Sequence, residues 1–145
     1  IIQLAGANPF FIQILCKEIV DYANANKIPL ITEYDVNEVV KRMTSSEARL
    51  SRGDFDNLLP VGDNKIFHEK VFGINLEDAM RLLKEISQNV NEFVSCNNLH
   101  SVNKTSKAKV ISCLIMRDVL EEHPEYGKEY VKIKVELFKE WLRKN

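Results

Sequence analysis

Apolar residues recur at helical spacing in several separate stretches of this 145-residue chain. From residue 9 to about residue 26 they fall three or four positions apart, with charged residues on the other side, which predicts an amphipathic helix. A short extended piece at residues 28–31 separates it from a second predicted helix, which ends near residue 44. That second helix follows a capping-box pattern in which Asp35 takes the usual place of Glu, three positions after Thr32.

The second half of the chain shows a different order of patterns. Asn75 is a suitable cap for a helix that runs to about residue 88, and a short helix is predicted over residues 90–99. A third helix is expected from a cap at Thr105 or Ser106 to about residue 117. Val131 and Ile133 then alternate with lysines, which is typical of a half-buried strand. With residues 119–121 on the other side of the turn at residues 123–128, this strand predicts a β-hairpin.

These patterns divide the chain into residues 1–45, 46–73 and 74–145. Helix, helix, helix and hairpin is the order of a winged helix, in which a helix-turn-helix unit is followed by a β-hairpin wing. Leu137, Phe138, Trp141 and Leu142 predict a closing helix that faces the core of this domain. Residues 46–73 are the least regular part, and we expect a linker with one or two short helical turns. The tripeptide at residues 52–54 spells an integrin-binding motif, but a surface turn is the favoured interpretation.

The first residues indicate a helix that ends, a tight turn, and a second helix that begins. Gly6 supplies the backbone freedom such a turn needs. Asn8 is a good N-cap, and Pro9 then occupies the first helical position, where its missing N–H costs nothing. Because Ile1 is followed at once by what looks like the last turn of a helix, we expect the chain to be a fragment of a longer protein.

Two of these segments resemble parts of one protein family. The opening turn resembles the one that begins the helical lid of STAND-like and related AAA+ P-loop ATPases. The tail, a "Y-V-K-I-K-V" strand running into "E-L-F-K-E-W-L-R-K-N", resembles the end of the winged-helix domain that follows the lid in bacterial and archaeal members. The resemblance implies a mainly α-helical chain: the end of a lid, then a winged helix with a two-stranded β wing. In the family, Gly usually stands where this chain has Ala7.

The same resemblance implies a role. Ala7, Asn8 and Pro9 would form the edge that faces ATP or ADP in the parent protein, and the lid would report the nucleotide state to the winged helix. The implied partners are an upstream nucleotide-binding domain and another protein or domain that contacts the winged helix. The chain has no G-x-x-x-x-G-K-[ST] motif to cradle phosphates. We therefore expect a regulatory piece that binds no cofactor and catalyses no reaction by itself.

Composition limits the classes of partner and the cellular compartment that we expect for this chain. The net charge of −1 argues against a protein whose main task is to coat nucleic acid or an anionic membrane. The longest apolar run, residues 110–116, is far shorter than the roughly 20 residues of a membrane span.

Three widely spaced cysteines do not suit a disulfide framework, so a reducing cytoplasm is the expected location. Cys96 and His100 are four residues apart, but two ligands do not make a zinc site, and no metal is predicted.

The main alternative is a winged-helix DNA-binding regulator. No acidic residue lies between Phe93 and Arg117, and Lys104, Lys107 and Lys109 supply positive charge at and along the third helix. The predicted wing, in contrast, carries several glutamates, which phosphates would repel. A third interpretation, a protein-interaction scaffold without an ATPase parent, predicts no P-loop in the coding sequence upstream.

Overall fold

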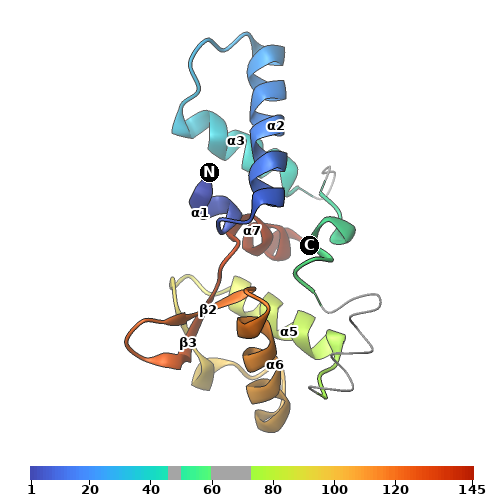
Figure 1. The fold of residues 1–145 in the computed structure, drawn as a ribbon, viewed down its shortest axis with the longest axis vertical. Helices are drawn as coiled ribbons and strands as arrows, with labels where there is room; N and C mark the ends of the chain where they lie inside the picture. Colours follow the sequence, from blue (N-terminus) through green and yellow to red (C-terminus); the bar gives the residue numbers. More distant parts are fainter. Residues whose placement is uncertain (46–49, 60–72) are drawn as a thin grey trace. The chain divides into compact units, whose positions relative to one another are not determined.

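The structure is a computed structural model that describes residues 1–45, 50–59 and 73–145 (Figure 1). This part of the chain is mainly helical and contains a small antiparallel sheet, which confirms the predicted mainly α class. It forms two compact units. Unit 1 contains residues Ile1–Ser51 and Val135–Asn145, and unit 2 contains residues Arg52–Lys134. The structure thus groups the chain differently from the predicted division, because the last helix belongs with the first residues.

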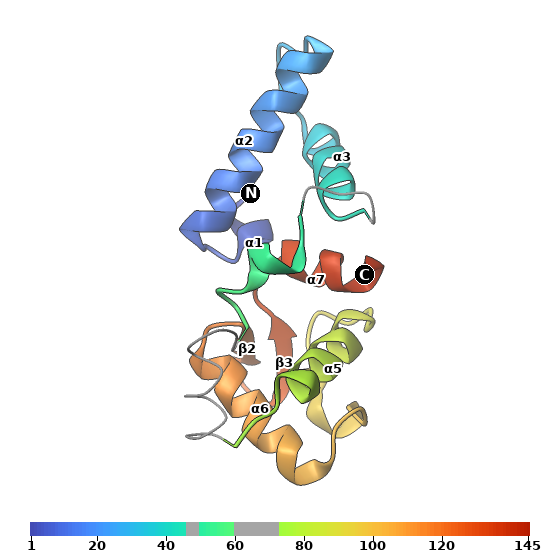
Figure 2. The same ribbon diagram turned by 90° about the vertical axis from the view of Figure 1, so that its right-hand side faces the viewer.

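The described residues of unit 1 form the helices α1 (Ile2–Ala5), α2 (Pro9–Asn26), α3 (Glu33–Met43) and α7 (Glu136–Lys144). Helix α2 packs against α3, and α1 packs against both α2 and α7, as two views of the unit show (Figures 1 and 2). The predicted helix over residues 9–26 is confirmed. The core of this unit is lined by apolar side chains from three helices: Phe11, Leu15, Ile19, Val39, Val40, Met43, Leu137, Phe138, Trp141 and Leu142.

The start of α3 confirms the predicted capping box. The Thr32 hydroxyl accepts a hydrogen bond from the Asp35 backbone N–H at 3.4 Å, and the Asp35 carboxylate accepts one from the Thr32 backbone N–H at 2.8 Å. The Thr32 hydroxyl also donates to this carboxylate at 2.6 Å. These bonds hold the pKa of Asp35 below its ordinary value, the bond from the Thr32 side chain having the largest effect.

Polar contacts fix α7 to the segment that follows α3. The Trp141 indole donates to the Leu50 carbonyl at 3.3 Å, and the Lys144 ammonium donates to the buried Thr44 hydroxyl at 2.7 Å. The helix predicted over residues 136–143 is confirmed, and its apolar face is buried. However, that face packs within unit 1 rather than completing the hairpin-bearing unit.

The first described element of unit 2 is a short 3-10 helix, η1 (Arg52–Phe55), and the next one described is α5 (Leu76–Ser87). Next come strand β1 (Val94–Ser95), the 3-10 turn η2 (Cys96–Asn98) and α6 (Lys104–Met116). The unit ends with the hairpin of β2 (Leu120–His123) and β3 (Gly127–Ile133). The strands form an antiparallel sheet in the order β1-β3-β2, and Val131 and Ile133 are buried as their alternation predicts.

The helix predicted over residues 90–99 is wrong. Val94 instead pairs with Val131 across β1 and β3, and both side chains are buried. The same pairing gives the sheet three strands, where two were predicted. The third helix begins slightly earlier than predicted, because Asn103, not Thr105 or Ser106, is its N-cap and accepts a hydrogen bond from Ser106 N–H at 2.9 Å.

Of the predicted linker, residues 50–59 and 73 belong to the described part, and residues 46–49 and 60–72 lie outside it. The described piece contains one short helical turn, η1, and packs Phe55, Leu58 and Leu59 into the interior. The integrin-like tripeptide forms part of η1. The Arg117 guanidinium, at the end of α6, donates to the carbonyls of Asn57 and Leu59 at 3.3 and 3.0 Å. Residues 52–59 are therefore a packed part of unit 2.

Candidate functional site

The predicted nucleotide-facing edge is an exposed turn between α1 and α2. Gly6 and Ala7 both have left-handed backbones, with φ values of 57° and 58°, and their N–H groups bond back to the carbonyls of α1. Asn8 is the N-cap of α2, since its side chain accepts a hydrogen bond from the Phe10 N–H at 3.0 Å. Pro9 occupies the first helical position. The predicted cap and turn are confirmed, and Ala7 and Pro9 are exposed.

The three lysines predicted to contact DNA have different surroundings. Lys107 is half-buried, and its ammonium donates to the carbonyls of Cys96 and Leu99, both at 2.8 Å. Its ammonium therefore provides hydrogen bonds to the backbone carbonyl at the start of η2 and to the one just after its end. Lys104 and Lys109 are exposed on α6. They lie on a solvent-facing stripe of this helix whose other members are small or apolar: Thr105, Ala108, Ser112 and Met116.

The carboxylate of Glu85 binds the backbone of the segment between η2 and α6. Glu85, on α5, accepts hydrogen bonds from the backbone N–H groups of His100 and Ser101 at 2.8 and 3.0 Å. Burial raises the pKa of Glu85, but the hydrogen bonds from Ser101 and His100 outweigh this effect and lower it. Together with Lys107, Glu85 fixes the connection that leads into α6.

Two cysteines, Cys96 and Cys113, lie in this part of unit 2. The Cys96 thiol donates to the Lys128 carbonyl at 3.0 Å, and burial raises the pKa of the thiol, which favours its protonated form. Burial has the same effect on Cys113. Among residues 1–45, 50–59 and 73–145, no cluster of three or more His, Cys, Asp or Glu side chains is arranged to hold a metal ion.

The sheet of unit 2 has a solvent-facing side that the sequence analysis did not single out. Because β2 and β3 bury Leu120, Val131 and Ile133 on one side, the alternating residues lie on the other. We call this side the outer sheet face. It comprises four side chains from the hairpin and three that lie beside them: Glu121, His123, Tyr130 and Lys132, with Glu92, Phe93 and Tyr126.

Aromatic rings gather around His123 on this face. The centroid of the His123 ring lies 4.7 Å from that of Phe93 and 4.8 Å from that of Tyr126, and Tyr126 lies 5.4 Å from Tyr130. His123 Nδ1 accepts hydrogen bonds from the backbone N–H groups of Glu125 and Tyr126 at 3.1 and 3.4 Å. The histidine thus shapes the turn at the end of the hairpin and positions its tyrosines.

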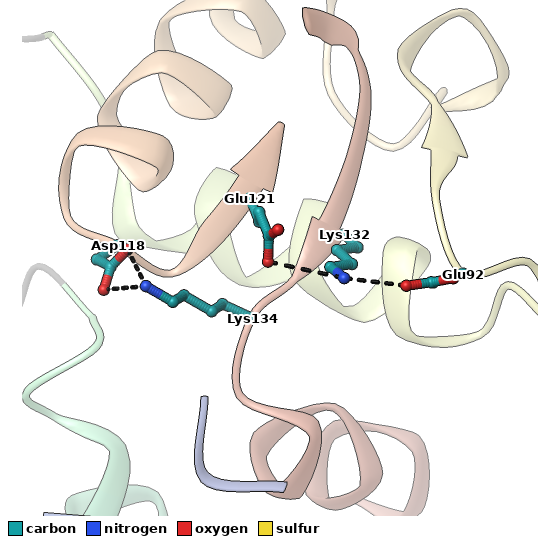
Figure 3. A network of polar contacts seen from close by, with 5 residues as sticks. All are labelled: Glu92, Asp118, Glu121, Lys132 and Lys134. Atoms are coloured by element: carbon teal, nitrogen blue, oxygen red, sulfur yellow. Dashed lines mark hydrogen bonds and ion pairs between the residues drawn. The ribbon is translucent and has the colours of Figure 1, made fainter. Parts of the chain in front are cut away.

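A row of charges crosses the same face (Figure 3). The Lys132 ammonium lies 3.0 Å from a Glu92 carboxylate oxygen and 3.7 Å from one of Glu121, and 4.7 Å from the centre of the Phe93 ring. Burial lowers the pKa of Lys132, but the hydrogen bonds and charges of Glu92 and Glu121 outweigh this and raise it. Beside this row, the Lys134 ammonium bonds both oxygens of Asp118 at 2.6 Å.

The comparisons with other proteins add no relative: no family model, curated protein or solved structure matches this chain. None of the helices in the described ranges is long and apolar enough to cross a membrane. The sequence signal that could have found the outer sheet face was the alternation in β3, whose polar positions include Tyr130 and Lys132. Phe93 contacts Lys132 and His123 contacts Tyr130, and only the pairing of the strands brings these residues close together.

Proposed function

We propose that this chain is the regulatory part of a STAND-like AAA+ P-loop ATPase. In this proposal, unit 1 contains the end of the helical lid, and unit 2 is a winged-helix module that contacts another protein or domain. The chain itself catalyses no reaction. The nucleotide, ATP or ADP, would bind to an upstream domain, and the exposed turn at Ala7, Asn8 and Pro9 would face it.

The observation that carries the proposal is the backbone of this turn. Ala7 has a φ of 58°, a conformation that glycine adopts far more easily than alanine. The ATPase family usually has glycine at this position, and a left-handed backbone is one that glycine adopts without strain, which supports the resemblance. Asn8 and Pro9 complete the turn as the cap and the first residue of α2.

The order of elements in unit 2 supports the winged-helix part. Helix α5 is followed by strand β1 and the short turn η2, then by α6, and then by the β2–β3 hairpin. On this assignment α6 is the third helix, the hairpin is the wing, and η2 replaces the second helix with a single 3-10 turn. Strand β1 adds a third strand beside the wing.

The chain connection suggests how the two units communicate. Strand β3 ends at Ile133 and α7 begins at Glu136, so two residues join the wing strand of unit 2 to a buried helix of unit 1. If ATP and ADP favour different positions of the lid helices, this short connection would carry the difference toward the wing. Such a transmitted rigid-body movement is a common form of nucleotide switching.

Protein is favoured over DNA as the partner because of the charges on the wing. Glu121, Glu122, Glu125 and Glu129 all belong to the hairpin and are exposed, so phosphates would be repelled there. On α6, the engagement of Lys107 with two backbone carbonyls leaves Lys104 and Lys109 as the exposed lysines.

The lid assignment is tested by hydrogen exchange in the intact ATPase that the proposal implies, with ATP and with ADP. We expect the amides of residues 5–12 to exchange at different rates in the two states. Residues 75–80 serve as a matched control, because Asn75 caps α5 as Asn8 caps α2, by accepting from the N–H two positions later. Equal exchange rates at residues 5–12 in both nucleotide states would contradict the lid assignment.

DNA binding remains the second candidate, because Lys104 and Lys109 are exposed on α6 and no acidic residue lies between Phe93 and Arg117. Fluorescent double-stranded DNA at about 50 and 200 mM salt tests it, since phosphate contacts weaken steeply over that range. DNA binding that is lost in the Lys104→Glu, Lys109→Glu double variant would favour this candidate. Lys107 is left unchanged in the variant, because its loss would disturb η2.

A further inference from the structure

We infer that the turn of the β2–β3 hairpin is a pH-sensitive device, in which His123 holds the turn closed only while its ring is neutral. This role of His123 goes beyond the proposed function and does not rest on it. Two features carry it: the hydrogen bonds that a ring nitrogen of His123 accepts from the turn backbone, and the aromatic rings that pack against the same ring.

His123 organises the backbone of this turn from its first position. The turn is closed where His123 pairs with Gly127 across β2 and β3. Pro124 has no backbone N–H, so the first donor after the histidine is the N–H of Glu125. Nδ1 of His123 accepts a hydrogen bond from this N–H at 3.1 Å, and one from the Tyr126 N–H at 3.4 Å. One nitrogen atom therefore binds both donors of the turn.

Elsewhere this chain makes the same kind of bond with asparagine. The side chains of Asn8, Asn75 and Asn89 each accept a hydrogen bond from the N–H two residues later, at 3.0, 2.9 and 3.1 Å. His123 does the same toward Glu125. An asparagine oxygen keeps its lone pairs at any ordinary pH, whereas a histidine nitrogen no longer accepts once it has taken up a proton. Histidine at this position therefore makes the bond depend on pH.

Protonation of the ring removes both bonds at once. Nδ1 of His123 can accept only when the single ring proton is on Nε2. In acid a proton from water adds to Nδ1, and the ring becomes a cation with two N–H donors and no acceptor. The N–H groups of Glu125 and Tyr126 then face another N–H, so the ring and the turn backbone must separate.

The rings around His123 connect this change to the surface of the hairpin. The centroid of the His123 ring lies 4.7 Å from that of Phe93, 4.8 Å from that of Tyr126 and 6.2 Å from that of Tyr130. Tyr126 belongs to the turn itself and is 58% exposed, so its side chain moves with the backbone that His123 releases. The position of an exposed tyrosine thus follows the charge of the histidine.

The other titratable groups around His123 change charge outside the range of this device. They lie before β1, on both strands and in the turn: Glu92, Glu121, Glu125, Tyr126, Lys128, Tyr130 and Lys132. The ordinary pKa of a carboxyl group is about 4 and that of tyrosine or lysine about 10, whereas that of histidine is about 6.5. Between about pH 5 and 8, histidine is the type of side chain among these that changes charge.

The test is solvent-exchange NMR on the full chain between about pH 5 and 8, with each rate corrected for the intrinsic exchange rate at that pH. We expect the protection of the Glu125 and Tyr126 amides to fall about ten-fold as the pH is lowered, as loss of one hydrogen bond allows. The ¹⁵N spectrum of the His123 ring should show Nδ1 without a proton at the upper end of the range.

Two variants and a control sharpen the test. His123→Asn keeps an acceptor for the N–H two residues later, so the Glu125 amide should stay protected at every pH. His123→Ala removes the acceptor and should leave both amides unprotected throughout. His100→Asn is the matched control, because His100 is an exposed histidine of the same unit and its replacement should leave the pH dependence of the turn unchanged.

Three results would overturn the inference. The first is constant protection of the Glu125 and Tyr126 amides while the His123 ring titrates. The second is an equal fall in protection of the Glu125 amide in His123→Asn and the wild type. The third is a proton on Nδ1 of the neutral ring. The wild type and the asparagine variant are sufficient for this decision if the alanine variant does not fold.

Discussion

Replacing Lys107 with methionine separates a structural lysine from a nucleic-acid contact. The substitution keeps an unbranched apolar side chain but removes the ammonium that donates to the carbonyls of Cys96 and Leu99, both at 2.8 Å. A hydrogen bond involving a charged group contributes about 1.5–3 kcal/mol. Lys107 is half-buried and water can replace part of each bond, so we expect a total loss of about 2 kcal/mol in the free energy of unfolding rather than the full sum.

Urea unfolding followed by far-UV circular dichroism measures this loss. With a urea dependence of about 2 kcal/mol per molar, a loss of about 2 kcal/mol lowers the unfolding midpoint by about 1 M. Lys104→Met is the matched control, because Lys104 is exposed on the same helix and a surface substitution of this kind changes stability by less than about 0.5 kcal/mol. If both variants unfold at the wild-type midpoint, or if both lose the same stability, Lys107 does not hold η2 as described.

Three further predictions concern the other parts of the structure. Ala7→Gly should raise the free energy of unfolding by up to about 1 kcal/mol by relieving the left-handed alanine, whereas Asn8→Ala should lower it by about 1 kcal/mol through loss of the cap, both measured by urea unfolding. The pKa of Glu85 is lowered in the folded state, so its stabilising effect is complete above the ordinary pKa of about 4.3 and is lost as the pH falls through the folded value. Glu85→Gln should therefore make stability below pH 5 less dependent on pH, and parallel pH profiles for variant and wild type would contradict this. Phe138→Ala empties a fully buried site beside the chain's one tryptophan, Trp141, and should cost about 3–5 kcal/mol, seen as a lower midpoint of the fluorescence transition.

Local features of the fold could be predicted because a few neighbouring residues decide them. The caps by Asn8 and Asn75, and the capping box of Thr32 and Asp35, involve side chains that bond to backbone two or three residues away. Such bonds depend on little beyond the local sequence, and these three predictions were confirmed. The alternation in β3 was equally local, since each strand residue points to the side opposite its neighbours.

Predictions failed where distant residues compete with local preference. Residues 90–99 have enough apolar positions for a short helix. However, Val94 pairs in the sheet with Val131, which lies 37 positions later in the chain. The role of Lys107 was equally hidden. In the sequence it is one of several lysines on a helix, and only the fold brings the carbonyls of η2 within reach of its ammonium.

The sequence by itself determined where most helices begin, which faces are apolar, and that a hairpin follows α6, because these depend on periodicity and on contacts within a few residues. Tertiary structure alone decided that α7 packs in unit 1, that β1 joins the hairpin, and that Phe93, His123 and Tyr126 gather on one face. Each of these depends on which distant apolar surface or strand edge a segment meets. That choice is set by burial and pairing over the whole chain, and no local pattern contains it.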